Sequence, residues 1–159
     1  MSRARIAIAG LTIGGAALVG IMAHEGFSPV AYVPVPGDKV TIGYGSTTHA
    51  DGTPIQRGET ITKPQALERA RLDLAKFEGA IKSCVKVPLH QHEFEAFVSL
   101  EYNIGSRAFC GSTLVRRLNA GDYAGACQAI LMWDRFQGRP LAGLTKRRQS
   151  EYKQCLGQF

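Results

Sequence analysis

Apolar and polar residues are distributed differently in three parts of the chain. Residues 6–23 contain no charged side chain and only one hydroxyl, that of Thr12. Residues 27–61 mix glycine, proline, threonine and β-branched residues in short runs, which is typical of short strands joined by turns. Beyond residue 62, apolar side chains recur every three or four positions, as on one face of a helix. The pattern predicts an apolar N-terminal segment, a small β lobe over residues 27–61 and a helical remainder.

The longest predicted helix runs over residues 63–84. Thr62 is a suitable N-cap, and Pro64 lies in the first turn, where a missing N–H leaves no hydrogen bond unmade. The apolar face consists of side chains at helical spacing, namely Leu67, Ala70, Leu74, Phe77 and Ile81. A helix of this length can link two lobes, so we predict an α+β, predominantly α fold with two lobes.

A helical lobe is predicted from residue 88 to residue 157. Its helices are separated by breaks at Gly105, at Ala120-Gly121 and at residues 138–143. The predicted helices cover residues 91–102, 112–119, 123–136 and 144–156. The basic run Lys146-Arg147-Arg148 in the last of them is interpreted as a solvent-exposed face.

The uncharged N-terminal segment bears on where the protein works. Its 18 residues, 6–23, are close to the shortest stretch that spans the roughly 30 Å hydrocarbon core as a helix. Arg3 and Arg5 precede it, and the positive-inside rule then places the N-terminus in the cytoplasm and residues 24–159 outside. Three interpretations compete: a cleaved signal peptide, a permanent anchor, and a segment that inserts and later leaves the bilayer. Half of the segment is glycine or alanine, so its membrane residence is marginal, and we favour the third.

The overall charge indicates an anionic partner. The chain has 19 lysines and arginines against 13 aspartates and glutamates, a formal net charge of +6. Such an excess of base suits nucleic acid, a membrane surface or an acidic polymer such as bacterial cell wall. Charge alone does not choose among these three.

The cysteines all lie in the part predicted to be exported. The spacing of Cys84, Cys110, Cys127 and Cys155 matches no zinc pattern. An even number in an oxidising compartment indicates two disulfides. Three pairings are possible, and the sequence alone does not choose. We favour Cys84–Cys110, between the end of the linking helix and the next helix pair, and Cys127–Cys155, between the last two helices; buried free thiols are the alternative.

Short motifs run through nearly the whole chain. They are Glu25-Gly26, Ala31-Tyr32, Pro36-Gly37-Asp38, TIGYG at 41–45, Tyr102-Asn103-Ile104-Gly105, LNAGDY at 118–123, Trp133 and LTKRR at 144–148. On these motifs the chain resembles the phage-type lysozymes, glycoside hydrolase family 24, and among them the endolysins of the signal-anchor-release (SAR) kind. The resemblance implies a lysozyme-like fold, with a SAR segment at residues 1–23 and a catalytic domain at residues 24–159.

The family's catalytic pattern is a Glu, an Asp and a Thr at fixed spacing. Glu25 and Thr41 match its two ends, but the interval between them is one residue longer here. The residues at the expected position of the Asp are Pro or Val, and neither can act as a base. We therefore assign the Asp role to Asp38, the nearest carboxylate, across a shifted loop. Asp51, in an Asp-Gly turn, is the alternative.

These residue types suit the cleavage of a glycosidic bond. That reaction needs a carboxylic acid to protonate the leaving oxygen and a carboxylate to activate or stabilise the attack. The resemblance implies that Glu25 is the acid, that Asp38 is the base and that Thr41 holds a water. The family's inverting outcome would place the two carboxyl groups roughly 6.5–9.5 Å apart. No cofactor and no metal are expected.

The resemblance also implies the biological role. It predicts a muramidase that hydrolyses the β-1,4 bond between N-acetylmuramic acid and N-acetylglucosamine in peptidoglycan and lyses the host for phage release. The expected partners are peptidoglycan and, transiently through residues 6–23, the inner membrane, with no nucleic acid. The enzyme would be tethered and inactive, with a cytoplasmic N-terminus, and then periplasmic and monomeric after release. A lytic transglycosylase and a non-enzymatic, membrane-anchored wall-binding protein are the alternatives.

Overall fold

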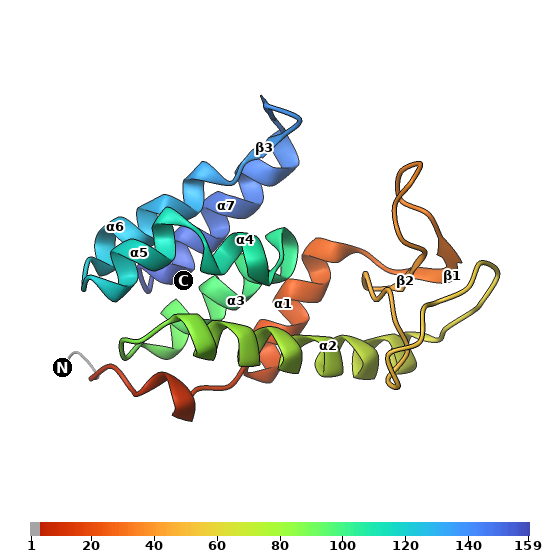
Figure 1. Ribbon diagram of the computed structural model, residues 1–159, viewed down its shortest axis with the longest axis horizontal. Coiled ribbons are helices and arrows are strands. Elements are labelled where there is room, and N and C mark those ends of the chain that lie inside the picture. Colours follow the sequence, from red (N-terminus) through yellow and green to blue (C-terminus); the bar gives the residue numbers. More distant parts are fainter. Residues whose placement is uncertain (1–3) are drawn as a thin grey trace. The chain divides into compact units, whose positions relative to one another are not determined.

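Helices dominate the computed structural model, which describes residues 4–159 (Figure 1). Contacts divide the described chain into two compact units. One comprises residues 15–76, and the other joins residues 4–14 to residues 77–159. The first contains the small sheet and the second most of the helices, so the predicted α+β, predominantly α, two-lobed lysozyme-like class is confirmed.

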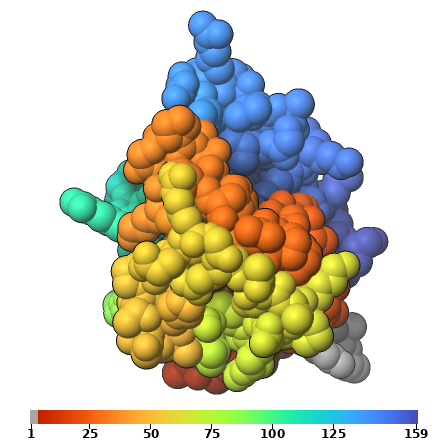
Figure 2. Space-filling view, turned by 90° about the vertical axis from the view of Figure 1, so that its right-hand side faces the viewer, coloured from red at the N-terminus to blue at the C-terminus, as the bar shows by residue number. Residues whose placement is uncertain are grey.

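The unit of residues 15–76 contains the β lobe, whose surface is orange to yellow in Figure 2. Helix α1 (Gly15–Glu25) leads into strand β1 (Ser28–Tyr32), which pairs antiparallel with β2 (Thr41–Gly43). A small core lies beneath the strands and consists of Ala31, Ile42 and Ile55, with Val40 and Ile61 packed against them.

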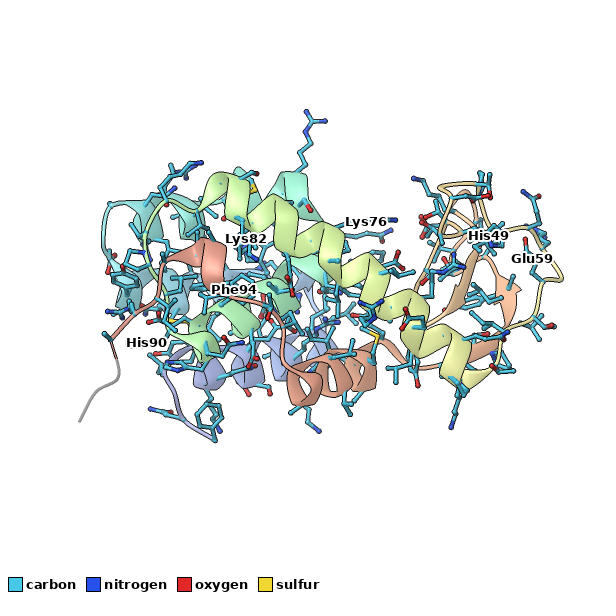
Figure 3. All side chains as sticks on the ribbon, turned by 90° about the horizontal axis from the view of Figure 1, so that it is seen from below. His49, Glu59, Lys76, Lys82, His90 and Phe94 are labelled. Atoms are coloured by element: carbon cyan, nitrogen blue, oxygen red, sulfur yellow. A yellow bond between two sulfur atoms is a disulfide. The ribbon has the colours of Figure 1, made fainter. Side chains whose placement is uncertain are left out.

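Helix α2 (Lys63–Cys84) has the bounds that its sequence predicts and contributes residues to both units. Its start is fixed by a capping box, because the Thr62 amide donates to Gln65 Oε1 at 2.9 Å and the Gln65 amide donates back to Thr62 Oγ1 at 3.4 Å. Three of the predicted apolar positions are fully buried, namely Ala70, Leu74 and Ile81. Near its C-terminal end the Lys82 ammonium lies 5.8 Å from the ring centroid of Phe94 (Figure 3).

The other unit contains two longer helices, α3 and α7, and several short ones. The elements are α3 (Gln91–Ile104), α4 (Ser106–Cys110), α5 (Thr113–Asn119), α6 (Tyr123–Ala129), the 3-10 helix η2 (Ile130–Met132), strands β3 (Arg135–Phe136) and β4 (Arg139–Pro140), and α7 (Ala142–Cys155). It contains two disulfides, Cys84–Cys110 and Cys127–Cys155, which are the pairs favoured from the sequence.

The prediction of one helix over residues 123–136 is wrong. Helix α6 ends at Ala129, and after η2 the chain turns into the β3–β4 hairpin. The tip of this hairpin needs left-handed backbone, with φ of 49° at Gln137 and 79° at Gly138. Such a short hairpin contains too few residues to reveal its period in the sequence.

The prediction of a solvent-exposed basic face on α7 holds for Lys146, which is exposed, and is wrong for the two arginines that follow it. Arg147 and Arg148 are 6% and 0% exposed. Both guanidinium groups donate to Oε1 of the buried Glu151, Arg147 through Nε at 3.1 Å and Arg148 through Nη2 at 3.0 Å. Arg148 Nη1 also donates to Asn103 Oδ1 at 2.9 Å, so the two arginines belong to a buried ion network that includes α3.

The apolar segment of residues 6–23 is not one helix here. A 3-10 helix, η1 (Ile8–Gly10), is followed by non-helical residues 11–14, and α1 begins only at Gly15. Among residues 4–159, no helix combines the length and the apolar character that a membrane span requires. Arg3, one of the two basic residues expected to set the orientation, lies outside the described residues.

Candidate active site

Glu25 is the last residue of α1, and its side chain is half-buried. Gly26 follows with φ of +72°, the left-handed conformation that commonly ends a helix. A carboxylate at a helix C-terminus faces the partial negative charge of the helix dipole, which is electrostatically unfavourable.

Asp38 lies in the loop that joins β1 to β2. Its amide donates to the Val35 carbonyl at 3.0 Å and closes a tight turn. Pro36 and Gly37 occupy the middle of that turn, and Gly37 has φ of +88°, which fits a type II turn. The Asp38 side chain is exposed to solvent. The Pro-Gly-Asp motif thus presents a carboxylate at the surface of the β lobe.

Thr41 is the first residue of β2 and is 8% exposed. Its Oγ1 donates a hydrogen bond to the Lys39 carbonyl at 3.1 Å. Because its proton is used in this bond, the lone pairs of the hydroxyl remain available to accept one. Two residues on, Gly43 has φ of +66°, and a Cβ there would lie 2.9 Å from Ala66 Cβ. The glycine therefore allows β2 to approach α2 closely.

The sheet and one aromatic pair bring the segments that contain Glu25 and Thr41 together. Ser28, three residues after Glu25, lies opposite Gly43, two residues after Thr41. The rings of Phe27 and Tyr44 also pack against each other, with centroids 5.4 Å apart. The turn that follows β2 is held to α2 by a 2.6 Å hydrogen bond from Ser46 Oγ to Asp73 Oδ2.

Asp51, the alternative to Asp38, is committed to its own turn. Its Oδ1 accepts hydrogen bonds from the Thr53 amide at 2.9 Å and from the Thr53 hydroxyl at 2.7 Å. These two bonds, the hydroxyl's first, lower the pKa of Asp51 below its ordinary value. This geometry assigns Asp51 a role in shaping the loop and favours Asp38 as the base.

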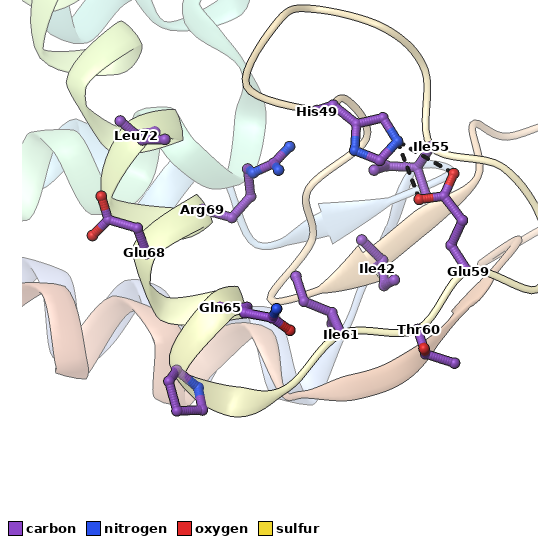
Figure 4. A pocket seen from close by; sticks show the side chains of 11 residues that line it. Ile42, His49, Ile55, Glu59, Thr60, Ile61, Gln65, Glu68, Arg69 and Leu72 are labelled. Carbon is purple, nitrogen blue, oxygen red and sulfur yellow. Dashed lines mark hydrogen bonds and ion pairs between the residues drawn. The ribbon is translucent and has the colours of Figure 1, made fainter.

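A cavity of about 550 Å³ lies elsewhere in the same unit, between α2 and the loop of residues 49–61 (Figure 4). Ile42 and Ile55 line it together with polar groups that include the pair His49–Glu59, whose Nε2 and Oε2 atoms are 3.1 Å apart. None of the three predicted catalytic residues lines this cavity. We therefore do not identify it with the candidate active site.

Some contributors to the site were not predicted from the sequence. The Lys39 carbonyl orients the Thr41 hydroxyl, and Phe27 packs on Tyr44. The aromatic residues could have been noticed, since one directly follows the Glu-Gly motif and the other lies inside TIGYG. A backbone carbonyl leaves no signal in the sequence.

Known proteins resemble the chain over most of its length. A profile of the phage lysozyme family matches residues 22–151. The endolysin of Salmonella phage P22 is 42% identical over 109 residues, which are 69% of this chain and 75% of that endolysin. The SAR-endolysin of Enterobacteria phage P21 is 32% identical over 147 residues, which are 92% of this chain and 87% of that protein.

A solved structure is similar as well. The crystal structure of a single-site mutant of P22 lysozyme matches with a TM-score of 0.80 at 36% identity, covering 92% of this chain and 99% of that one. The chain therefore belongs to the phage lysozyme family and is a lysozyme-type hydrolase.

Proposed function

We propose that the chain hydrolyses the β-1,4 bond between N-acetylmuramic acid and N-acetylglucosamine in peptidoglycan, with Glu25, Asp38 and Thr41 as its catalytic residues. Family membership and the endolysin relatives support the substrate class. The observation that carries the proposal is the strand register. It holds Ser28 opposite Gly43, so the segments containing Glu25 and Thr41 run together within one compact unit.

Each residue has a distinct part in the proposed reaction. Glu25 donates a proton to the glycosidic oxygen as the bond breaks. Asp38 accepts a proton from a water that attacks the anomeric carbon from the opposite face. Thr41 accepts a hydrogen bond from that water, because its own hydroxyl proton is held by the Lys39 carbonyl. The water thus has two acceptors, and its lone pair points at the sugar.

We propose that the chain is exported, tethered in the inner membrane through residues 6–23 and inactive until it is released. The uncharged segment and the similarity to the SAR-endolysin of phage P21 support this proposal. In the tethered state Glu25 is only two residues from the end of the segment and is held at the lipid interface. Release lets residues 15–25 form α1 and completes the site.

Mass spectrometry of the soluble products from purified peptidoglycan tests the reaction. Muropeptides with a reducing-end muramic acid are expected, since water is the nucleophile. Products lighter by one water, with an anhydro-muramic end, would instead identify a lytic transglycosylase and leave Asp38 without a catalytic role. An absence of soluble products would favour a wall-binding protein.

A further inference from the structure

The geometry points to a receptor surface on the helical unit for the N-terminal strap, residues 5–14 of the same chain, with Arg5 as its anchoring residue. This inference rests on the proposed tethering and adds a regulatory role for Arg5. Before release, Arg5 is a positive charge on the cytoplasmic flank of the membrane segment. After release, it binds Glu93, so one residue both opposes release and completes docking.

The anchor is a bidentate ion pair. Arg5 Nη2 donates to Glu93 Oε1 at 2.7 Å, and Arg5 Nε donates to Glu93 Oε2 at 3.0 Å. The guanidinium carbon also lies 3.6 Å from the centroid of the Tyr123 ring. This combination of a bidentate ion pair and a contact with an aromatic ring is specific to arginine, because a lysine ammonium cannot make two parallel bonds to one carboxylate.

Glu93 is also held by a hydrogen bond within its own helix. It is the third residue of α3, and its Oε2 accepts the His90 amide at 2.8 Å in a capping box. With the strap docked, its side chain is only 5% exposed. A carboxylate that is fixed by its own helix and pairs with Arg5 is suited to act as a receptor group.

The strap's backbone is bound along its length. Ile6 and Leu89 exchange two hydrogen bonds, at 2.8 and 2.9 Å. Further on, the Ile13 amide donates to Glu78 Oε1 at 2.6 Å, and Gln91 Nε2 donates to the Thr12 carbonyl at 2.7 Å. In a bilayer these backbone groups would have to pair within a helix. The receptor surface offers them partners in a non-helical conformation.

Gly14 shows that the surface also selects for small size. Its amide donates to Glu95 Oε1 at 3.2 Å, and a Cβ at position 14 would lie 3.1 Å from that same oxygen. At Gly15, the next residue, an added Cβ meets nothing within 4 Å. A valine at either position makes the segment more apolar, but only Gly14→Val should disturb docking.

The membrane potential acts directly on this anchor. Arg5 must move from the cytoplasmic side to the outer side to reach Glu93. With a potential that is negative inside, the outward movement of a positive charge is opposed in proportion to the potential. Collapse of the potential removes that opposition, and the ion pair with Glu93 then holds the strap outside.

Amide hydrogen exchange of the purified full-length chain, with its disulfides intact, tests docking independently of enzyme activity. We expect Arg5→Met to speed exchange of residues 6–14 and of Leu89 by about tenfold or more, with α7 unchanged. Exchange in Arg5→Lys should be faster than in the wild type and slower than in Arg5→Met. Arg107→Met, which changes an exposed arginine on α4, should exchange as the wild type does. Gly14→Val should expose the strap and Gly15→Val should not. Equal exchange in Arg5→Met and Arg107→Met would overturn the proposal.

Glu93→Gln tests the regulatory part in cells. Glutamine keeps the capping box and leaves the charges that flank the membrane segment unchanged, so export and tethering should be normal. After a protonophore collapses the potential, the variant should enter the soluble fraction several-fold more slowly than the wild type. Equal rates would overturn the regulatory role of Arg5 and Glu93. Because neither experiment measures wall hydrolysis, a failure of the proposed catalytic reaction would be distinguishable.

Discussion

The two compact units differ in where they place charged side chains, at the surface in one and in the interior in the other. In the unit of residues 15–76, Asp38 and Asp51 are exposed on loops around a small apolar core. In the other unit, Arg148 and Glu151 are buried in one ion network, and two disulfides cross-link the helices. Catalytic carboxylates need access to water and substrate, whereas buried ions need fixed partners. We therefore expect Asp38 to act on substrate, Asp51 to shape its own loop and the buried ions of the other unit to maintain the fold.

Replacing the proton donor should have the largest effect on activity. Glu25→Gln keeps the size of the side chain but supplies no proton, so we expect hydrolysis of purified peptidoglycan to fall by about a thousandfold. Thermal unfolding of the same sample shows whether the variant is folded. Glu68→Gln, on the exposed surface of α2, is the control. Activity of Glu25→Gln within tenfold of that control would remove Glu25 from the mechanism.

The two aspartates of the β lobe provide a matched pair. Asp38→Asn should lower the rate by about a hundredfold or more, with little change in stability. Asp51→Asn should leave the rate within a few-fold and lower the denaturation midpoint slightly, since Thr53 loses a charged acceptor. Rates and thermal unfolding of both variants decide between them. The opposite pattern would assign the role of catalytic base to Asp51.

The buried network of the helical unit should respond in stability rather than chemistry. Arg148→Met removes partners of Glu151 and Asn103, and we expect the free energy of unfolding to fall by about 3 kcal/mol. Arg139→Met, in the exposed β3–β4 hairpin, should change it by less than about 0.5 kcal/mol. Denaturant titration measures both. Similar values for the two variants would show that the network contributes little.

A buried carboxyl on α3 predicts that stability depends on pH. Burial raises the pKa of Glu101 to about 7. A raised folded-state pKa gives stability that is complete below the unfolded value and lost as pH rises toward 7, at about 1.4 kcal/mol per pH unit. Glu101→Gln should remove this slope. Parallel stability profiles for wild type and variant between pH 4.5 and 7 would contradict it.

Local signals in the sequence predicted the elements that depend on local interactions. The bounds of α2 follow from Thr62, Pro64 and a regular apolar face, and the Pro-Gly-Asp turn follows from the conformations those residues prefer. The β3–β4 hairpin and the short helix α4 contain too few residues to show a period. The strand register that pairs Ser28 with Gly43, and so aligns the segments that contain Glu25 and Thr41, depends on tertiary packing.

Two runs in the sequence are ambiguous, because the same amino-acid composition suits two different environments. A basic run suits either solvent or a buried ion network, and an apolar run suits either a bilayer or a protein surface. Lys146-Arg147-Arg148 has the composition of a solvated surface, yet Glu151 and Asn103 make burial of both arginines possible. Residues 6–23 suit a bilayer, yet Leu11 is 1% exposed in contact with protein. A sequence shows which side chains are apolar or charged, and only the fold supplies their partners.

The configuration of the newly formed reducing end tests the central claim most directly. Proton NMR of the first products from purified peptidoglycan, recorded before mutarotation, distinguishes the two anomers. Attack by a water held between Asp38 and Thr41 predicts the inverted α-anomer, with the carboxyl groups of Glu25 and Asp38 roughly 6.5–9.5 Å apart. A retained β-anomer would contradict the account, because it requires a covalent or directly stabilised intermediate and carboxyl groups about 5 Å apart.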